Sequence, residues 1–376
     1  MNYFQFELIH TSKKSRARVG RIYTPHGIID TPNFVAVGTN GTVKALDNAL
    51  VNELGLQLMF CNTYHLIVHP GADIVEQAGG LHQFINRPHP IITDSGGFQV
   101  FSLAYGTVKE ELKSKGTKKH TEAVIKITEE GALFRSYRDG SPIFLTPESS
   151  IQAQKKLGAD IIIPFDELPP YHIDPKVLER SLHRTHRWEE RSLNEHKKDV
   201  RQQAMYGVIH GGIDPQLRKL SCEYLTKLPF DGFAIGGSVG KNKQEMVDIV
   251  SYTAQLLPED KPNHLLGIGD LESVDACVRF GIDTFDSSHP TRSARHGLLF
   301  TSQGDVKILQ TKYKVHFEPV DKECQCPTCI HYTAAYLHHL FKAREAAALI
   351  LATTHNLAFM IKLMKQYQQA ILEDRL

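Results

Sequence analysis

The stretch PESSIQAQKKLGADIIIPFDE, residues 147–167, contains the pattern that decides the fold of this 376-residue chain. Its first part, 147–158, opens with proline and an acid and closes on glycine, which is typical of a helix. An unbroken apolar run, 161–163, follows closely and leads to Asp166. Apolarity without alternation predicts a strand that is buried on both faces, as the strands of a parallel sheet are.

Short apolar runs of this kind recur along the chain, with helix-like stretches between them. A second helix pattern, DLESVDACVRFG, covers 270–281. Eight runs predict a parallel (β/α)8 barrel, the TIM-barrel architecture, and a doubly wound open sheet is the alternative. The barrel is favoured because no glycine-rich phosphate-binding turn follows the first run. The eight runs are 34–37, 56–60, 91–92, 161–163, 205–209, 233–235, 265–268 and 284–285.

The composition bounds the class of protein. Lysine and arginine (43) nearly balance aspartate and glutamate (42), so any grip on a nucleic acid must come from local patches. No apolar run reaches the length of a signal peptide or a membrane span, so we expect a cytoplasmic protein with no membrane partner. The lysine-rich stretch 105–121 is expected to be a solvated loop, and contact with RNA is the alternative.

Three of the six cysteines, Cys324, Cys326 and Cys329, lie within six positions. Thiolates at this spacing are the ligands that tetrahedral zinc selects, and a fourth ligand is needed. Four protein ligands leave no open position for water, so we expect one structural zinc ion. The other three cysteines are scattered, which disfavours a disulfide framework. The spacing leaves four histidines open as the fourth ligand: His331, His338, His339 and His355.

The regular alternation of strands and helices ends beyond Gly297, where the cysteine cluster and a long helical pattern over about 333–371 follow. The length suits one elaborated domain better than two small ones. We therefore expect a single catalytic domain over 1–376. Within it, residues 298–360 are expected to form a zinc-binding subdomain with a C-terminal helical region.

Three of the predicted strands lead to aspartate: Asp94, Asp166 and Asp286. The catalytic groups of a parallel barrel collect where its strands end, so these carboxylates are expected to share a pocket. Bringing like charges together costs energy, so several carboxylates at one place indicate a functional site. Two carboxylates suit cleavage of a glycosidic bond, because one attacks the anomeric carbon while another handles the proton of the leaving group.

Several long motifs in the same order along the chain resemble the bacterial-type tRNA-guanine transglycosylases. The match begins near TPHG (24–27) and ends at HNL (355–357), so it covers almost the whole chain. The motifs are DSGGFQVFSL (94–103), KITEEGALFRS (126–136), LTPESSI (145–151), FDSSHPTRSARHG (285–297), the cysteine cluster and AYLHHLFKA (335–343).

This resemblance implies a zinc-bearing barrel, usually a homodimer, whose partners are the anticodon loop of tRNA and a free deazaguanine base. Members exchange the wobble guanine of GUN anticodons, in the tRNAs for histidine, tyrosine, aspartate and asparagine, through a covalent intermediate. No further C-terminal RNA-binding module follows the zinc motif. In this the chain is similar to the anticodon-acting enzymes and not to the archaeal ones that modify the D-arm.

The resemblance also implies roles for individual residues. Asp286 matches the nucleophile, and Asp94 matches the general acid-base. Asp166 matches the carboxylate that recognises the guanine edge, where its oxygens can accept from N1–H and the exocyclic amine. Phe98 and Leu266 match the positions that sandwich the base. The remaining matches are His210 and Gly237 in the base pocket, Thr291, Arg292 and Arg295 as RNA contacts, and His355 as the fourth zinc ligand.

The base pocket departs from the family pattern. Leu168 replaces a cysteine, His210 a glutamine and Lys241 a glutamate, and a leucine after Gly237 is missing. A cationic aminomethyl group would lose a backbone acceptor and meet a like charge, and the shorter loop would leave room for a larger substituent. We therefore predict queuine as the incoming base, with its hydroxyls on Ser238, Ser287 or His289, and 7-aminomethyl-7-deazaguanine as the alternative.

Two other functions are the alternatives to exchange. One is a non-catalytic partner subunit. Such a subunit would be expected to lose catalytic carboxylates, whereas this chain retains all three aspartates. A barrel hydrolase that releases free base without exchange is the other.

Overall fold

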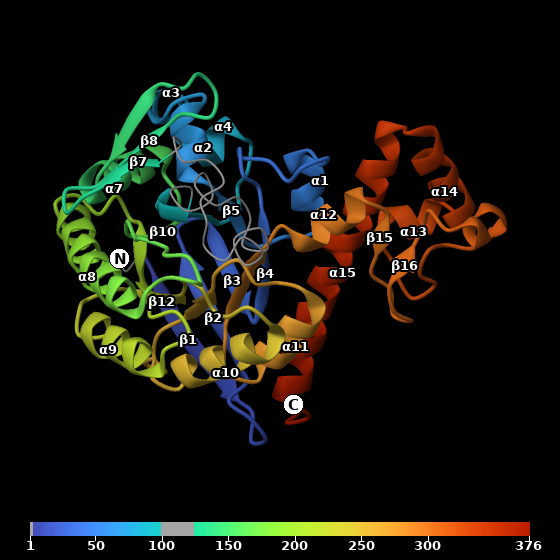
Figure 1. Ribbon diagram of the computed structural model, residues 1–376. Coiled ribbons are helices and arrows are strands. Elements are labelled where there is room, and N and C mark those ends of the chain that lie inside the picture. Colours follow the sequence, from blue (N-terminus) through green and yellow to red (C-terminus); the bar gives the residue numbers. More distant parts are fainter. Residues whose placement is uncertain (1–2, 99–123) are drawn as a thin grey trace.

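The computed structural model describes residues 3–98 and 124–376, and it contains a closed barrel of eight parallel strands (Figure 1). The predicted barrel is therefore confirmed and the open sheet is wrong. The strands follow one another around the barrel in chain order, and the last strand pairs with the first to close it. They are β4 (Asn33–Val37), β5 (Met59–Cys61), β6 (Ile91–Thr93), β10 (Ile161–Ile162), β11 (Ala204–Ile209), β12 (Gly232–Ile235), β13 (Asn263–Leu265) and β14 (Thr284–Ser287).

Helices surround the barrel, and both helices predicted from the sequence form (Figure 1). Helix α7 (Pro147–Leu157) ends at Gly158, which adopts the left-handed conformation with φ of 72°. Helix α11 (Leu271–Val278) starts where the Asp270 side chain caps the backbone N–H of Ser273. The other barrel helices are α1 (Asn48–Glu53), α2 (Thr63–Val68), α3 (Ala72–Gln77), α4 (Leu81–Phe84), α8 (Pro175–Lys197), α9 (Pro215–Leu225), α10 (Lys243–Ala254) and α12 (His289–Arg295).

Three expectations about element boundaries are corrected. The helix expected over 333–371 is two helices, α14 (Ala334–Ala343) and α15 (Ala346–Leu372), because the left-handed backbone of Arg344 (φ 59°) interrupts it. Strand β13 ends before Gly267, whose φ of 74° takes the chain out of the sheet. Most of the run at 56–60 precedes β5 and is buried without being part of the strand, which begins at Met59. The lysine-rich stretch 105–121 lies outside the described residues.

Side chains alternate between the interior of the barrel and its outer surface along each strand, as the pleat requires. Val35, Phe60 and Ile92 belong to the inner cluster, whereas their neighbours along the strands pack against the helices. On β13 and β14, by contrast, the corresponding inward positions are polar. They are His264, Thr284 and Asp286, all buried.

A three-stranded antiparallel sheet packs beneath the barrel, made of β1 (Gln5–Thr11), β2 (Arg18–Thr24) and β3 (Gly27–Thr31). Its Ile22 and Ile29 belong to the same cluster as the inward side chains of the barrel. Arg18 donates to both carboxylate oxygens of the buried Asp283, immediately before β14, over 3.1 and 2.6 Å. A bidentate, desolvated pair of this kind fixes the orientation of the sheet relative to the barrel.

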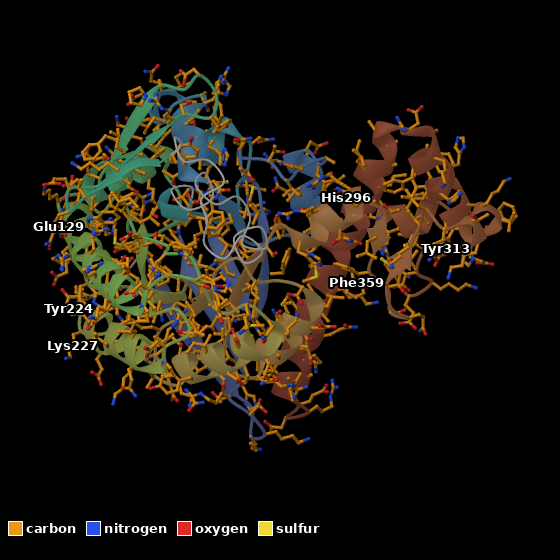
Figure 2. The ribbon with its side chains drawn as sticks, in the orientation of Figure 1. Glu129, Tyr224, Lys227, His296, Tyr313 and Phe359 are labelled. Atoms are coloured by element: carbon orange, nitrogen blue, oxygen red, sulfur yellow. The ribbon has the colours of Figure 1, made fainter. Side chains whose placement is uncertain are left out.

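A second small sheet, β7 (Val124–Ile127), β8 (Ala132–Arg135) and β9 (Pro142–Leu145), lies between β6 and α7 in the chain. It packs beside α8, where Arg187 forms a bidentate pair with Glu129 at the outer edge (Figure 2). The sheet therefore braces the long helix α8 from outside the barrel.

The residues beyond Gly297 form a lobe beside the barrel (Figure 1). It contains β15 (Leu298–Leu299), β16 (Val306–Lys307), a 3-10 turn (Thr311–Val315), α13 (Pro327–His331) and α14. Helix α15 then returns along the barrel, and its Phe359 packs edge-on against Phe300 with ring centres 6.0 Å apart (Figure 2). By length and composition α15 could cross a membrane, but half of that stretch is buried within the protein, so it is a core helix of this fold.

A second buried carboxylate, Asp160, connects three elements at the amino-terminal end of the barrel. It accepts from His26 Nδ1 (2.7 Å), in the turn between β2 and β3, from His82 Nε2 (3.0 Å) on α4, and from the backbone N–H of Ile91 (2.8 Å). The two imidazole rings stack with their centres 3.5 Å apart and nearly parallel, and each directs a nitrogen to Asp160. The cluster therefore acts as a hydrogen-bonded latch.

Protonation strengthens this latch. The hydrogen bond to Asp160 raises the pKa of His26. Burial would raise the pKa of Asp160, but hydrogen bonds from His26 and His82 hold it below its usual range. A histidine with a raised pKa stabilises the fold fully below its unfolded pKa of about 6.5, and the contribution is lost as the pH rises through the folded pKa.

We predict that His26→Gln destabilises the protein more at pH 5.5 than at pH 8.5, because only the acidic condition retains the charged latch in the wild type. Urea unfolding of both proteins at the two pH values measures this difference. His183→Gln, at an exposed histidine of α8, serves as the control and should show no such trend. Equal destabilisation by His26→Gln at both pH values would contradict the prediction.

Candidate active site

The three aspartates that the sequence singles out lie at the same end of the barrel. Asp94 directly follows β6, Asp166 lies four residues beyond β10, and Asp286 is the third residue of β14. Since the strands are parallel and form a closed ring, their carboxyl ends share one rim. A chain of contacts through neighbouring loops connects the three carboxylates around this rim.

Asp94 is held by the start of α2. Its Oδ1 accepts from the backbone N–H of Thr63 (2.7 Å) and its Oδ2 from the side-chain amide of Asn62 (2.6 Å). The carboxylate is 8% exposed, so these donors replace most of the water that it loses. The side chain is therefore oriented by the backbone of the neighbouring loop.

Asp166 is joined to the loop that carries Asp94. Ser95 donates to its Oδ1 (2.8 Å), and a Cβ on Gly97 would lie 2.6 Å from the same oxygen. Only glycine lets the loop approach this closely. On the other side, His210 Nε2 lies 2.9 Å from Asp166 Oδ2. Both oxygens are thus oriented, and each keeps a further lone pair for a ligand.

Neutral groups lie behind His210. Its backbone N–H donates to Ser221, whose hydroxyl also contacts His186 at 3.1 Å. Burial lowers the pKa of His186 to about 3, so this ring is uncharged at neutral pH. Burial also raises the pKa of Glu189 well above its usual range, which favours the neutral form of that carboxyl. Asp166 and His210 are therefore the polar pair that faces the pocket.

Arg218 of α9 organises the two glycine-containing loops of the pocket and was not identified from the sequence. It is fully buried and donates to the carbonyls of Gly212 (2.8 Å), Ile209 (2.8 Å) and Gly236 (2.9 Å). A weaker bond reaches Ser238 at 3.3 Å. Nothing in its local sequence distinguishes Arg218 from a surface arginine of a helix.

The loop after β12 brings Gly237 against His210. Gly237 has φ of 78°, and a Cβ there would lie 2.9 Å from His210 Nδ1. A small cavity adjoins this contact, and its lining includes Glu167, Ser181, His210 and Ser238. Three buried polar atoms on that lining have no hydrogen-bond partner among the described residues: Ser181 Oγ, His210 Nδ1 and Ser238 Oγ.

Lys241 is paired at the far end of the same loop. Its Nζ lies 3.2 Å from Glu245 Oε1, and its backbone N–H donates to Glu245 Oε2 (3.0 Å). Tyr171 donates to the same carboxylate over 3.0 Å. The charge of Glu245 is therefore neutralised locally by Lys241.

The predicted base-stacking residues lie on two of these loops. Phe98, in the glycine loop after Asp94, is 44% exposed. Leu266 packs beneath Gly236, where a Cβ would lie 3.1 Å from its Cδ1. Leu266 therefore connects the pocket loop to the strand beside the nucleophile candidate.

Asp286 is buried at the end of β14 and is held from the β13 side. Its Oδ1 accepts from the backbone N–H of Gly267 (2.7 Å) and lies 3.1 Å from His264 Nε2. His264 is a second residue of this site that the sequence reasoning missed, because its position beside a predicted strand does not reveal which carboxylate it contacts. Ser287 accepts from the backbone N–H of His289 (3.0 Å) and so caps the following turn.

The predicted RNA contacts lie on the short helix α12, directly after Asp286 and Ser287. Arg292 is exposed and donates to Ser288 Oγ (2.7 Å), whereas Arg295 is half-buried and donates to the carbonyl of Thr291 (3.0 Å). Burial, with the nearby charge of Arg292, lowers the pKa of Arg295. Thr291 is buried, and its hydroxyl donates within the helix, to the carbonyl of Ser288.

The lobe contains a candidate metal centre. Cys324, Cys326, Cys329 and His355 place their ligand atoms within 4.8 Å of one another, so His355 is the histidine that joins the cysteines. His355 Nδ1 lies 3.6 and 3.3 Å from the sulfurs of Cys326 and Cys329. Zinc bonded to sulfur and nitrogen at tetrahedral angles would separate such atoms by about 3.6 Å, so the four residues fit that ion.

The surroundings of His355 also suit a metal ligand. Its Nε2 lies 2.7 Å from the carbonyl of Phe300, which fixes the proton on Nε2 and turns the lone pair of Nδ1 toward the sulfurs. The next residue, Asn356, donates to the carbonyls of Pro290 (2.9 Å) and Leu298 (3.0 Å). The centre is thereby joined through α15 to the helix that carries the arginines.

Comparison with known proteins agrees with this arrangement. A family model described as queuine tRNA-ribosyltransferase matches residues 12–376. The chain is 68% identical over 374 residues to a queuine tRNA-ribosyltransferase of Protochlamydia amoebophila, covering 100% of this chain and 97% of that protein. Over 373 residues it is 58% and 56% identical to the proteins of that name from Chlamydia abortus and Chlamydia trachomatis, covering 99% of each chain. The chain therefore belongs to the queuine tRNA-ribosyltransferase family.

Proposed function

We propose that this protein is a tRNA-guanine transglycosylase that removes the wobble guanine of GUN-anticodon tRNAs and installs a 7-deazaguanine through a covalent aspartyl-ribose intermediate. The observation that carries the proposal is the set of three carboxylates at one rim, each with different partners. Asp286 is held through one oxygen, Asp94 by two donors of the α2 loop, and Asp166 by Ser95 and His210. Different environments are what separate nucleophile, acid-base and recognition roles.

In the first half of the reaction an oxygen of Asp286 bonds to C1′ of the ribose as the bond from C1′ to guanine N9 breaks. The leaving guanine gains a proton, and Asp94 is the group that we assign to this transfer. In the second half the incoming base bonds to C1′ through N9 and loses a proton, and the electron pair returns to Asp286. Asp166 supplies acceptors for the N1–H and amino group of either base.

We predict that Asp286→Asn still binds tRNA but lowers exchange about a thousandfold or more and forms no denaturant-stable RNA adduct, because an amide is a far weaker nucleophile. Denaturing gels of enzyme with tRNA measure the adduct. Asp305→Asn, at an exposed aspartate of the lobe, is the matched control and should behave as wild type. Undiminished adduct in Asp286→Asn would remove Asp286 from the nucleophile role.

A guanine-release assay distinguishes the alternative functions. Guanine release from tRNA is followed with and without an added base. Transglycosylation needs the base for net turnover, a hydrolase releases guanine without it, and a non-catalytic subunit releases none. Net release that is independent of the base, or no release at all, would therefore contradict the proposal.

We further propose queuine as the incoming base. Lys241 neutralises Glu245, and this pairing bears equally on both candidate bases, because each carries a protonated amine on its 7-methylene group. The small cavity beside this loop is lined by polar atoms of His210 and Ser238 that have no hydrogen-bond partner among the described residues, which suits a hydroxyl-bearing substituent. This polar lining favours the hydroxyl-bearing queuine over 7-aminomethyl-7-deazaguanine.

Side-by-side incorporation into guanine-bearing tRNA tests this choice of base. We expect a higher kcat/KM for queuine, and we expect Lys241→Glu to raise kcat/KM for the aminomethyl base by about three- to tenfold, because it replaces a like charge by an opposite one. Lys227→Glu, which makes the same charge change on the far side of α9, should alter neither value (Figure 2). A wild-type kcat/KM for the aminomethyl base tenfold above that for queuine would show that the loop has been misinterpreted.

We propose that the lobe holds one structural zinc ion on Cys324, Cys326, Cys329 and His355. Three sulfurs and one nitrogen fill a tetrahedron, so the ion would stabilise the lobe and have no open position for catalysis. Its connection to α12 through Asn356 links the fold of the lobe to the arginines proposed to contact RNA.

We predict that Cys326→Ser removes zinc, lowers Tm by roughly 5 °C or more and weakens tRNA binding, because the lobe and α12 lose their shared anchor. Metal analysis, calorimetry and tRNA titration measure the three effects. Cys222→Ser, at a buried cysteine of α9, is the control and should keep one zinc per chain. A Cys326→Ser protein that retains a full complement of zinc would argue against this ligand set.

We also propose a homodimer that acts in the cytoplasm, where its tRNA substrate is found. The lobe exposes an aromatic cluster in which Tyr332 stacks on Tyr336, and Tyr336 on His339. Ile330 and Phe317, 57% and 73% exposed, lie in the same lobe. Exposed apolar side chains of this size on one lobe favour a protein interface.

A further inference from the structure

His264 contacts the residue to which the proposed function assigns nucleophilic attack. It is fully buried on β13, and its ring lies between two inward side chains of β14. Nδ1 lies 2.8 Å from Thr284 Oγ1, and Nε2 lies 3.1 Å from Asp286 Oδ1. The strand register explains both contacts, because His264 pairs with Thr284 across the parallel ladder and Asp286 is the next inward position.

An imidazole at this position is unusual for the barrel interior. The inward residues of the strands other than β13 and β14 belong to a hydrophobic cluster, and Phe60 of β5 packs against the His264 ring with centres 6.1 Å apart. A polar group buried among such residues costs free energy unless it is hydrogen-bonded. Both nitrogens of His264 have partners, so the cost is offset, and one of those partners is Asp286.

The partners of His264 also determine where its proton lies. An ionised carboxylate only accepts hydrogen bonds, so Nε2 carries the proton in the contact with Asp286. In the neutral ring Nδ1 then accepts from the Thr284 hydroxyl. Asp286 therefore sets the tautomer of His264, and the Thr284 hydroxyl, which can donate or accept, is the partner of Nδ1.

Both hydrogen bonds that Asp286 receives from the described residues end on the same oxygen. The backbone N–H of Gly267 donates to Oδ1 over 2.7 Å, and His264 is the second donor. Two donors on one oxygen fix the rotation of the carboxylate about its terminal bond. They leave Oδ2 as the oxygen that can bond to C1′.

We propose that His264 is a positioning residue for Asp286: it holds Oδ1, presents Oδ2 to the ribose and stabilises the charge that returns to the carboxylate when the ribose is transferred. This inference rests on the proposed function, in which Asp286 is the nucleophile. It adds a residue that acts through Asp286 and does not touch the substrate itself.

The two halves of the reaction should respond differently to the loss of this donor. Asp286 gives up its charge when Oδ2 bonds to C1′, and it recovers that charge when N9 of the incoming base takes C1′ and the electron pair returns to Oδ2. A hydrogen bond to Oδ1 is stronger when the carboxylate is charged. Removing the donor should therefore slow the second half more than the first, and the covalent adduct should accumulate.

Two substitutions at this position separate donation from packing. His264→Gln can accept from Thr284 and donate to Asp286, whereas His264→Phe keeps a flat ring but cannot donate. His196→Phe, at another buried histidine on α8, controls for the loss of a core imidazole. Each variant is measured for Tm, tRNA affinity, kcat at saturating queuine, and the steady-state fraction of enzyme held as RNA adduct.

We expect His264→Phe to lower kcat by about 10- to 100-fold, with tRNA affinity within threefold of wild type and a larger fraction of enzyme in the adduct. His264→Gln should recover kcat to within about fivefold of wild type, and His196→Phe should keep kcat. If His264→Phe is too unstable to assay, Thr284→Val removes the partner that holds Nδ1 of the His264 ring and should lower kcat with the same rise in adduct.

Three results would overturn the inference: wild-type kcat in His264→Phe, equal losses in the Gln and Phe variants that follow Tm, or a fall in the adduct fraction alongside kcat. Failure of the proposed function looks different. In that case the wild-type enzyme itself forms no adduct, or Asp286→Asn retains it, whatever happens at His264.

Discussion

Closure of the parallel barrel between β14 and β4 is the constraint on which the rest of the structure depends. It makes Asp286 a neighbour of Val35 in the ladder and brings the ends of eight strands to one rim, although their residues span much of the chain. Each strand supplies only two to six residues to the barrel, so the interior is filled by few side chains per strand. The pair of Arg18 with Asp283 and the latch at Asp160 secure the opposite end.

Three carboxylates lie at the carboxyl end of the barrel strands. Their mutual repulsion costs free energy unless hydrogen-bond donors stabilise each charge. The structure supplies a separate set of donors to each of them. Backbone and amide N–H groups hold Asp94, a hydroxyl and an imidazole hold Asp166, and a backbone N–H with a second imidazole holds Asp286. Because the donors differ in kind and number, three residues of one type can take three different roles.

The lobe is coupled to the site through α15 and not through the barrel strands. His355 and Asn356 are adjacent on this helix, so one contacts the cysteine cluster while the other holds the carbonyls of Pro290 and Leu298. Helix α12 follows Asp286 within three residues. The cysteine cluster, the arginines of α12 and the end of β14 are therefore linked through the same helix.

The sequence by itself determined the features that local pattern encodes. Unbroken apolar runs predicted the barrel, the spacing of Cys324, Cys326 and Cys329 predicted a metal cluster, and long ordered motifs identified the family. Strand ends were less accurate, because a glycine such as Gly267 interrupts an apolar run only through its backbone conformation.

Only the tertiary structure decided which distant side chains meet. The cysteine spacing left four histidines open, and geometry brings His355 to the sulfurs because α15 folds back beside the cluster. Arg218 and His264 carry no local signal of their roles, since each depends on carbonyls or carboxylates from other strands and loops. The pairing of Lys241 with Glu245 likewise depends on how the loop meets α10. Such contacts follow from barrel register and loop packing, which no short stretch of sequence contains.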